Sequence, residues 1–434
     1  MWTGQWIWSA GTALGGPTRS QPYGSLDRAR FDQRVLFRRV FEVADVPGDA
    51  WLRISADARY LLYVNGSEVG AGPVRHGPRR LEYDVYDVRA LLVPGRNVVA
   101  VLGRFYGHPV PWWEPSPPSF TMGGGGLVAE LRTGDRVIGT DETWRCSPGI
   151  AWQAAEPPSM LLTQLPEFLD ARLLDPRWTQ PDFDDSGWED ARVLAEHSIV
   201  GPQGATHPPT EPWGALAPRP IPHLTGDLRT ATTIHHHIPH EPVAGGNGRG
   251  DVWRELSAVL GRRVGAGDRV SGGDGDRVLV VADFGMVVAG RLELEVDGPA
   301  GAVVVGALLE VPTVAALDSA PVFRYVTRGH DDRYISGDPI GGRYAVLLLD
   351  HPTVVRSVRL RESHRPRRAV QPFTSSDERL DEIYRVGLRT VDLTAHDAYV
   401  DCPTREQRAW TGDAVVHQSV DLVANQDWSL ARWN

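Results

Sequence analysis

Residues 51–66 read Trp51-Leu52-Arg53-Ile54-Ser55-Ala56-Asp57-Ala58-Arg59-Tyr60-Leu61-Leu62-Tyr63-Val64-Asn65-Gly66. Apolar and polar residues alternate in short runs, which is the period of a strand with one buried face. Asn65-Gly66 suits a two-residue hairpin turn, because both central positions of that turn require a positive φ. The alternation continues over residues 35–106. We therefore expect a β-sandwich over roughly residues 30–150, within an amino-terminal, carbohydrate-binding-like domain of residues 1–195.

A second strand-rich region begins near Val278. The runs at residues 278–281, 292–296 and 302–305 are rich in Val and Leu and are separated by Gly and Asp, which predicts separate strands. Similar runs at residues 344–349 and 354–360 continue the pattern. This region predicts a second sandwich of residues 245–366. Residues 200–224 are rich in Pro and Gly, so residues 196–244 are expected to form an ordered linker.

The hydrophobic period changes after Phe373. Ser375-Ser376-Asp377-Glu378 has the pattern of a capping box, and Leu380, Ile383, Tyr384, Leu388 and Val391 then recur at helical spacing. A second helix is expected from about Gly412 toward Asn425, with Val416, Val420 and Val423 on one face. The predicted fold is therefore multidomain and mainly β, with two β-sandwich (jelly-roll-like) domains followed by a helical region of residues 367–434.

Composition narrows the function classes. The chain has 434 residues, 41% of them hydrophobic and 23% charged, and a net charge of −10. These values are typical of a globular protein and argue against a nucleic-acid partner, which requires clustered cations. The sequence has no apolar run long enough for a membrane span and no leader-like start, so we expect a cytoplasmic protein that does not contact a membrane.

The densest polar cluster is Asp401-Cys402-Pro403-Thr404-Arg405-Glu406-Gln407-Arg408-Ala409-Trp410-Thr411-Gly412-Asp413, between the two predicted helices. It holds three carboxylates, two guanidinium groups and an indole within thirteen residues. Pro403 interrupts a helix, which places the cluster on a loop. Glycoside hydrolysis needs one carboxylic acid to protonate the leaving oxygen, a second carboxylate, and polar groups for the sugar hydroxyls. This cluster can supply part of that set.

The same thirteen residues resemble the signature at the mouth of the (α/α)6 barrel in family 78 α-L-rhamnosidases. Residues 55–66, Gly72-Pro73, residues 83–88 and Gly95-Arg96-Asn97 resemble the amino-terminal sandwich of that family, and residues 183–188 and 281–285 resemble its intermediate regions in the same order. The resemblance covers nearly the whole chain. It implies an inverting hydrolase that releases terminal, non-reducing α-L-rhamnose from an oligosaccharide or glycoside.

Carried over by position, the resemblance makes Glu406 the general acid and Asp401 and Asp413 the residues that bind or orient the rhamnose hydroxyls. Arg405 would sit beside these acids, and Trp410 would offer an apolar wall to the sugar. Many family members have one more residue before the Trp, so the acid can also be matched to the position of Gln407, and Asp413 is the second choice for the acid.

The resemblance also implies that residues 367–434 are the first helices of an incomplete (α/α)6 catalytic barrel. The general base would then be a glutamate from a later part of the barrel, beyond Asn434. The chain as given is then expected to have little or no activity. The competing interpretation is a non-catalytic carbohydrate-binding β-sandwich protein, in which the terminal helices merely pack against the second sandwich.

Several features have alternative interpretations. We expect no cofactor, with calcium as the alternative, and we interpret His235-His236-His237 and His240 as solvated linker residues rather than metal ligands. Asp57, Asn65, Asp84 and Asp87 are either calcium ligands of a sugar-binding sandwich or turn-forming residues, and the second reading is favoured. Trp112 and Trp113 either stack on carbohydrate or close the sandwich. Cys402 is expected to be a packed thiol rather than a nucleophile, and a disulfide with Cys146 has little support.

Overall fold

The computed structural model describes the chain except for residues 11–17, 20–31, 47, 76–80, 107–120, 123–124, 154–165, 196, 199–200, 203–205, 211–212, 239–248, 261–276, 318–319, 351 and 369–372. Trp112, Trp113 and His240, which the sequence singles out, lie outside the described residues. The contacts divide the chain into two compact units. Unit 1 comprises Met1–Ile150 and Leu174–Arg219, and unit 2 comprises Ala151–Leu173 and Pro220–Asn434.

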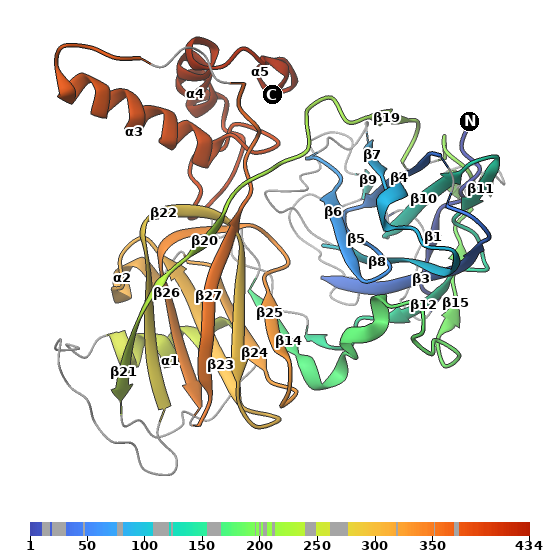
Figure 1. Cartoon of the computed structure of the whole chain (residues 1–434), viewed down its shortest axis with the longest axis horizontal. Helices are drawn as coiled ribbons and strands as arrows, with labels where there is room; N and C mark the ends of the chain where they lie inside the picture. The colour runs from blue at the N-terminus through green and yellow to red at the C-terminus, as the bar shows by residue number, and fades with distance from the viewer. Residues whose placement is uncertain are drawn as a thin grey trace. The chain divides into compact units, whose positions relative to one another are not determined.

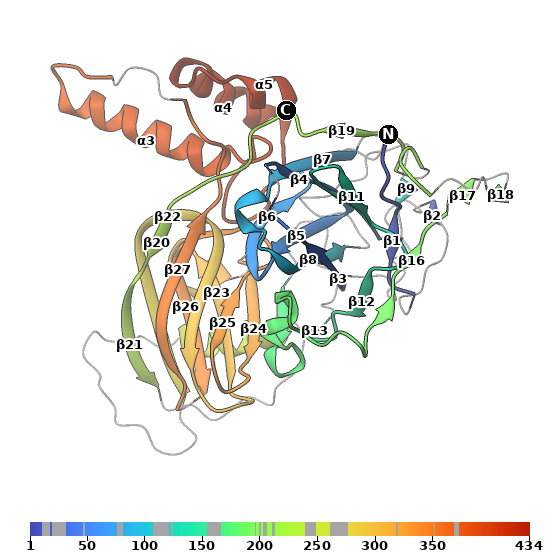
Figure 2. The ribbon, with the colours of Figure 1, turned by 45° about the vertical axis from the view of Figure 1, so that its right-hand side comes forward.

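Unit 1 contains two antiparallel-rich sheets (Figure 2). The 7-stranded sheet has the order β16 (Arg192–Val193), β1 (Ile7–Trp8), β10 (Gly126–Thr133), β4 (Ala50–Asp57), β7 (Leu81–Asp87) and β19 (Leu216–Pro218), with β11 (Arg136–Gly139) beside β10. The 6-stranded sheet has the order β15 (Glu189–Asp190), β12 (Arg145–Pro148), β3 (Gln33–Val43), β8 (Gly95–Phe105), β5 (Arg59–Val64) and β6 (Ser67–Gly72). The buried Tyr60 hydroxyl of β5 donates to Asp84 of β7, so the two sheets face each other as a sandwich.

Short elements complete unit 1. Two-stranded pairs form between β2 (Thr18–Arg19) and β9 (Thr121–Met122), and between β17 (His197–Ser198) and β18 (Gly201–Pro202). Turns of 3-10 helix occur at η2 (Arg89–Leu91) and η4 (Pro176–Thr179).

The predicted hairpin at Asn65-Gly66 is confirmed. The two residues have φ of 48° and 82° and join β5 to β6, whose ends pair Val64 with Ser67. The Asn65 amide also donates to Asn97 Oδ1 at 2.7 Å and its oxygen accepts from Val98 N at 2.8 Å. Asn65 is therefore a turn residue that also ties β5 to β8.

Unit 2 is built on one hydrogen-bonded 10-stranded sheet (Figure 1). Its order is β13 (Trp152–Gln153), β14 (Glu167–Asp170), β24 (Val322–Val326), β23 (Val303–Leu309), β26 (Ile340–Asp350), β22 (Arg277–Asp297), β27 (Val354–Glu362) and β20 (Leu228–Thr230), with β21 (Thr232–Ile238) and β25 (Asp332–Ile335) also paired to β22. The 3-10 turn η3 (Ala171–Leu173) and the short helix α2 (Val314–Leu317) flank this sheet.

The strand β22 corrects the expectation of separate strands at residues 278–281 and 292–296, because both runs belong to this one strand. Its register against β26 shifts between Asp283 and Val288, where Gly285 has φ of 76°. The first half of β22 pairs with β21, and the second half pairs with β27 and β25. The glycine and the irregularity thus bend one strand so that it serves two groups of partners, instead of ending it.

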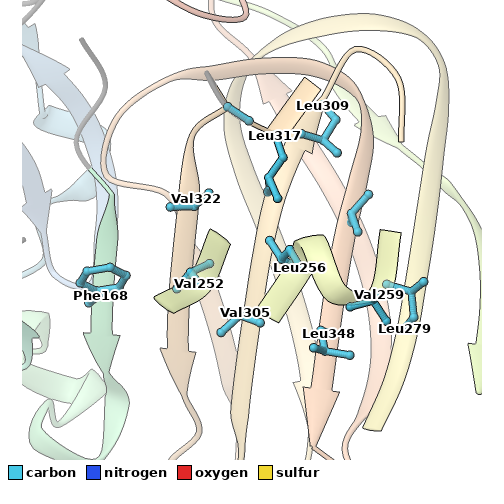
Figure 3. Close-up of a cluster of buried hydrophobic side chains, with 13 residues drawn as sticks. Phe168, Val252, Leu256, Val259, Leu279, Val305, Leu309, Leu317, Val322 and Leu348 are labelled. Atoms are coloured by element: carbon cyan, nitrogen blue, oxygen red, sulfur yellow. The ribbon is translucent and has the colours of Figure 1, made fainter. Parts of the chain in front are cut away.

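A helix that the sequence analysis missed covers one face of this sheet (Figure 3). In α1 (Arg249–Leu260), Val252, Leu256 and Val259 recur at helical spacing and are buried. They pack against strand residues that include Leu279 and Val305. Burying three large apolar side chains contributes several kcal/mol, about 1.5–3 each.

The helical region of unit 2 begins where predicted. Helix α3 (Glu378–Thr394) is capped by Asp377, whose carboxylate accepts from Arg379 N at 3.0 Å, so the cap is Asp377 and not Ser375. Helices α4 (Thr411–Ala424) and α5 (Ser429–Trp433) follow. Both views show α3, α4 and α5 beyond the end of the sheet at which β22 bends (Figures 1 and 2), and the Arg389 guanidinium donates to Val287 O at that bend.

Two predicted boundaries are corrected. Residues 151–173 belong to unit 2, because β14 pairs in parallel with β24 of the second sheet. The expected linker of residues 196–244 contains strands β19, β20 and β21, and His235, His236 and His237 lie on β21 opposite β22. The proline and glycine content of this segment predicted irregular structure, but it did not predict these strands, whose partners are distant in sequence. Among the described residues, no helix has the length and hydrophobicity that a membrane crossing requires.

Candidate active site

Residues 401–410 of the polar cluster lie in the connection between α3 and α4, and residues 411–413 begin α4. The loop is closed at its base because Asp401 N donates to Arg408 O at 2.9 Å and Arg408 N donates to Asp401 Oδ1 at 2.8 Å. Pro403 lies at the start of the intervening turn, where a helix would lose a backbone donor. The predicted placement on a loop is confirmed for residues 401–410, whereas residues 411–413 belong to the first turn of α4.

Glu406 and Trp410 form the part of this loop that faces solvent. Trp410 Nε1 donates to Glu406 Oε2 at 2.9 Å, and the indole remains 51% exposed. Glu406 is half-buried and Arg405 is exposed. A carboxyl group, a half-exposed indole and a guanidinium group are therefore presented together by one loop.

Asp413 lies in the first turn of α4, where the positive end of the helix dipole favours a negative charge. Asp401 stands at the base of the loop and is half-buried. The charges of both carboxylates act on His417, one turn beyond Asp413 on α4. The structure thus gathers the five residues predicted from the sequence at one hairpin: four on the loop and Asp413 on the helix that follows.

His417 was not predicted as a site residue, although its four-residue spacing from Asp413 was visible in the sequence. Burial lowers the pKa of His417, and the charges of Asp413 and Asp401 partly oppose this. The imidazole is therefore neutral at neutral pH, and its Nδ1 is buried without a hydrogen-bond partner among the described residues.

A buried ion pair joins Arg365 to Asp421 of α4, the helix that follows the loop. Arg365 Nη2 donates to both oxygens of Asp421, at 2.5 and 2.6 Å, and the hydroxyl of Tyr399 donates to the same carboxylate. Burial and Asp421 raise the pKa of Tyr399, which stays protonated. No local sequence signal joins Arg365 to Asp421, because 56 positions separate them.

Gln407 is fully buried, and its side-chain amide donates to Pro403 O at 2.6 Å. The position that an alternative alignment would assign to the acid is thus directed into the protein. Cys402 Sγ donates to Asp401 Oδ2 at 3.0 Å, and burial together with Asp401 raises the thiol pKa. A protonated, packed thiol is a poor nucleophile. Cys402 and Cys146 are both free, so no disulfide forms.

The four residues considered as calcium ligands have protein partners. Asp57 accepts from Trp213 Nε1 at 2.9 Å, Asp84 pairs with Arg219 at 3.0 Å, and Asp87 accepts from Arg89 N at 3.0 Å. Asn65 occupies the hairpin turn. Within the described ranges, no group of three or more His, Cys, Asp or Glu side chains is arranged to hold a metal ion.

Two family models match the chain. The α-L-rhamnosidase N-terminal domain matches residues 46–209, and the bacterial α-L-rhamnosidase six-hairpin glycosidase domain matches residues 368–430, a range that encloses all five candidate residues. An α-L-rhamnosidase of Streptomyces avermitilis is 32% identical over 146 residues, which are 32% of this chain and 14% of that protein.

Solved structures show the same fold. A GH78 family rhamnosidase of Bacillus sp. GL1 superposes with a TM-score of 0.74 at 21% identity, covering 99% of this chain and 62% of that one. The α-L-rhamnosidase of Dictyoglumus thermophilum gives 0.65 at 20% identity over 99% of this chain and 44% of that one. The Streptomyces avermitilis enzyme complexed with L-rhamnose gives 0.58 at 20% identity over 91% of this chain and 36% of that one. The chain therefore spans less than two thirds of each of these relatives. The two domain models together match more than half of the chain, so it belongs to the bacterial α-L-rhamnosidase family.

Proposed function

We propose that this protein is a glycoside hydrolase that removes terminal, non-reducing α-L-rhamnose from a glycoside or oligosaccharide with inversion at the anomeric carbon. The observation that carries the proposal is the Glu406–Trp410 pair, a carboxyl group held beside an open indole face on the loop that the six-hairpin domain model encloses. The acid can protonate the leaving oxygen, and the indole offers an apolar surface to a sugar that carries a methyl group.

Each candidate residue has a role in this proposal. Glu406 donates its proton to the glycosidic oxygen while the bond from that oxygen to the anomeric carbon breaks, and the bonding electron pair remains on the leaving oxygen. Asp401 and Asp413 accept hydrogen bonds from sugar hydroxyls, and the Trp410 ring packs against the apolar face of the sugar. Arg405 supplies positive charge beside these carboxylates.

Inversion also requires a water molecule and a general base on the opposite side of the sugar, with the two carboxyl groups roughly 6.5–9.5 Å apart. The proposal assigns no general base to residues 1–434. We therefore expect this chain by itself to bind L-rhamnose but to hydrolyse rhamnosides slowly or not at all.

The experiment that tests the function has a binding arm and a hydrolysis arm. Calorimetric titration of the 434-residue chain with L-rhamnose is expected to show binding that weakens in Asp401→Asn and Asp413→Asn. Glu378→Gln, at an exposed carboxylate in the first turn of α3, serves as the matched control.

Release of p-nitrophenol from p-nitrophenyl α-L-rhamnoside is then compared between this chain and the complete product of its gene. The proposal requires hydrolysis by the complete product of the gene and a loss of about 100-fold or more in its Glu406→Gln variant. A complete product that binds sugars but hydrolyses no rhamnoside would instead identify a carbohydrate-binding protein. A Glu406→Gln variant as fast as the wild type would exclude Glu406 as the acid.

A further inference from the structure

The loop that carries Glu406 rests on the 10-stranded sheet of unit 2. Thr404 Oγ1 donates to Glu310 Oε1, which follows directly after the end of β23, at 2.5 Å. Gln407 Nε2, besides its bond to Pro403 O, lies 3.4 Å from Pro339 O, immediately before β26. The loop therefore contacts two neighbouring strands of the sheet, at the end of β23 and the adjacent start of β26.

Gly341 in β26 allows this close approach. A side chain at residue 341 would place its Cβ atom 2.1 Å from Pro403 O, well inside van der Waals contact. The absence of a Cβ at this position lets the loop backbone lie directly on the strand. The sheet is thus shaped to receive the loop.

The loop has an inner and an outer face. Thr404 and Gln407 are buried against the sheet, whereas Arg405 is exposed and Glu406 half-buried between them. The residues proposed to meet the sugar therefore lie between two residues that hold the loop. Since Thr404 and Gln407 flank Glu406 in sequence, a shift of the inner face must move Glu406.

Gln407 adopts a backbone conformation that a residue with a side chain seldom takes. Its φ is 54°, in the left-handed region, which costs a non-glycine residue about 1–2 kcal/mol. Asn or Gly would adopt this conformation more readily, but neither reaches as far as the Gln side chain, whose amide bridges to Pro403. Strain of this kind persists where surrounding contacts over-determine the backbone. Here it lies next to Glu406.

We propose that Gln407 and the Glu310–Thr404 hydrogen bond are positioning groups for Glu406, so that the β-sheet of unit 2 sets the placement of the general acid. The inference rests on the proposed function for its chemistry, but the attachment of the loop is a property that can be measured without activity. Glu310 takes part from 94 positions away in sequence, and its hydrogen bond is to Thr404, which is not one of the proposed sugar-binding residues.

The first arm of the test measures amide hydrogen exchange of peptides spanning residues 401–410 in the 434-residue chain. Thr404→Val, which removes the hydroxyl but keeps the branched shape, and Glu310→Ala should each raise exchange in this segment by about tenfold, as expected for the loss of roughly 1.4 kcal/mol of local protection. Thr404→Ser retains the donor and should restore protection. Glu378→Ala, at an exposed Glu on α3, is the control.

Gln407→Gly and Gln407→Asn test the second attachment, since both accept a positive φ but remove or shorten the amide. If either fails to fold, the Thr404 and Glu310 variants still decide the question, because Glu310 is exposed on the sheet. Unchanged amide exchange of residues 401–410 in both Thr404→Val and Glu310→Ala would refute the inference that the Glu310–Thr404 hydrogen bond holds the loop on the sheet.

The second arm measures kcat/KM in the complete product of the gene for two substrates whose leaving groups differ in their need for protonation. The difference between the substrates reports the contribution of the general acid. Phenyl α-L-rhamnoside requires protonation of its departing oxygen. The leaving group of 2,4-dinitrophenyl α-L-rhamnoside, in contrast, departs readily as the 2,4-dinitrophenolate anion. Misplacing the acid should therefore lower kcat/KM for the phenyl glycoside by roughly tenfold or more in Glu310→Ala and Thr404→Val, and change the dinitrophenyl value less than about twofold. Equal losses of kcat/KM on both substrates would mean that the Glu310–Thr404 hydrogen bond has only a general structural role. That outcome would contradict the positioning role. A complete product of the gene that is inactive on both glycosides would contradict the proposed function, and the exchange experiment on the 434-residue chain alone would then decide the attachment of the loop.

Discussion

The indole N–H of Trp410 donates a hydrogen bond to Glu406 Oε2 over 2.9 Å, and this bond fixes the plane of an otherwise exposed ring. An exposed aromatic ring held by such a bond is pre-organised to pack on a sugar, because it loses little rotational freedom when it binds.

Removing the Trp410 ring should weaken the binding of L-rhamnose. We expect Trp410→Ala to reduce the affinity of the 434-residue chain about tenfold, and Trp410→Phe, which keeps an aromatic face, to reduce it less. Trp428→Ala is the matched control, because Trp428 is also exposed in the helical region but donates to Asn425 O instead of a proposed site residue. Calorimetric titration measures the effect, and equal affinities for Trp410→Ala and Trp428→Ala would refute the apolar-wall role.

Breaking the buried ion pair beneath the site should destabilise unit 2. The side chains of Arg365 and Asp421 are 2% and 3% exposed, so Asp421→Ala leaves a buried guanidinium without its partner. We expect a loss of about 3–5 kcal/mol in the free energy of unfolding, measured by urea denaturation. The double variant Arg365→Met/Asp421→Leu replaces both charges with apolar groups and should recover most of that loss. A double variant as unstable as the single one would show that the charges themselves are required.

Protonation of Asp57 should make the stability of unit 1 depend on pH. Burial raises the pKa of Asp57 to about 6, and the hydrogen bond from Trp213 only partly offsets it. Because this folded-state pKa exceeds the unfolded value of about 4, the folded protein holds the proton more tightly. The carboxyl therefore lowers the stability as pH rises from about 4 to about 6, with no further change above that.

The test is the difference in unfolding free energy between the wild type and Asp57→Asn as a function of pH. Asn keeps an acceptor for the Trp213 N–H but cannot ionise, so the variant should gain up to about 3 kcal/mol relative to the wild type between pH 4 and 7. Asp45→Asn, at an exposed acid of the same unit, should show no such gain. Parallel pH profiles for the wild type and Asp57→Asn would disprove the assignment.

Valines of equal predicted importance on the two helices should differ in their contribution to stability. Val391 of α3 is buried, whereas Val423 of α4 is 71% exposed. Val391→Ala should lower the free energy of unfolding by about 1.5–3 kcal/mol, and Val423→Ala should change it by less than about 0.5 kcal/mol. Thermal or urea unfolding of the two variants distinguishes these outcomes, and similar losses would mean that the exposed face of α4 is covered in solution.

Local features of the fold were predictable because their causes are local. Asn65-Gly66 identified its hairpin since a positive φ at two successive positions selects those residues, and α3 and α4 followed from apolar spacing over a few turns. Helix α1 was missed because the surrounding strand-rich sequence dominated the interpretation, although Val252, Leu256 and Val259 carried the helical period.

Pairing between distant segments was not predictable in the same way. Gly285 and its polar neighbours suggested the end of a strand, but β22 continues past them because β26 and β27 lie beside its two halves. Likewise β21 and its three histidines looked like a linker until β22 supplied the backbone partners. A strand is defined by its neighbours, and single-sequence periodicity does not contain them.

The sequence by itself determined the order of the mainly β and helical regions and placed Asp401, Arg405, Glu406, Trp410 and Asp413 in one short segment, because contiguity guarantees proximity. Only the tertiary structure decided which of these side chains face outward and what holds them there. Thr404 and Gln407 turn inward because Glu310, Pro339 and Gly341 meet them from a sheet that folds from remote parts of the chain. The physical reason is that hydrophobic spacing and turn chemistry act over a few residues, whereas the hydrogen bonds and close packing that orient a site are made across the whole unit.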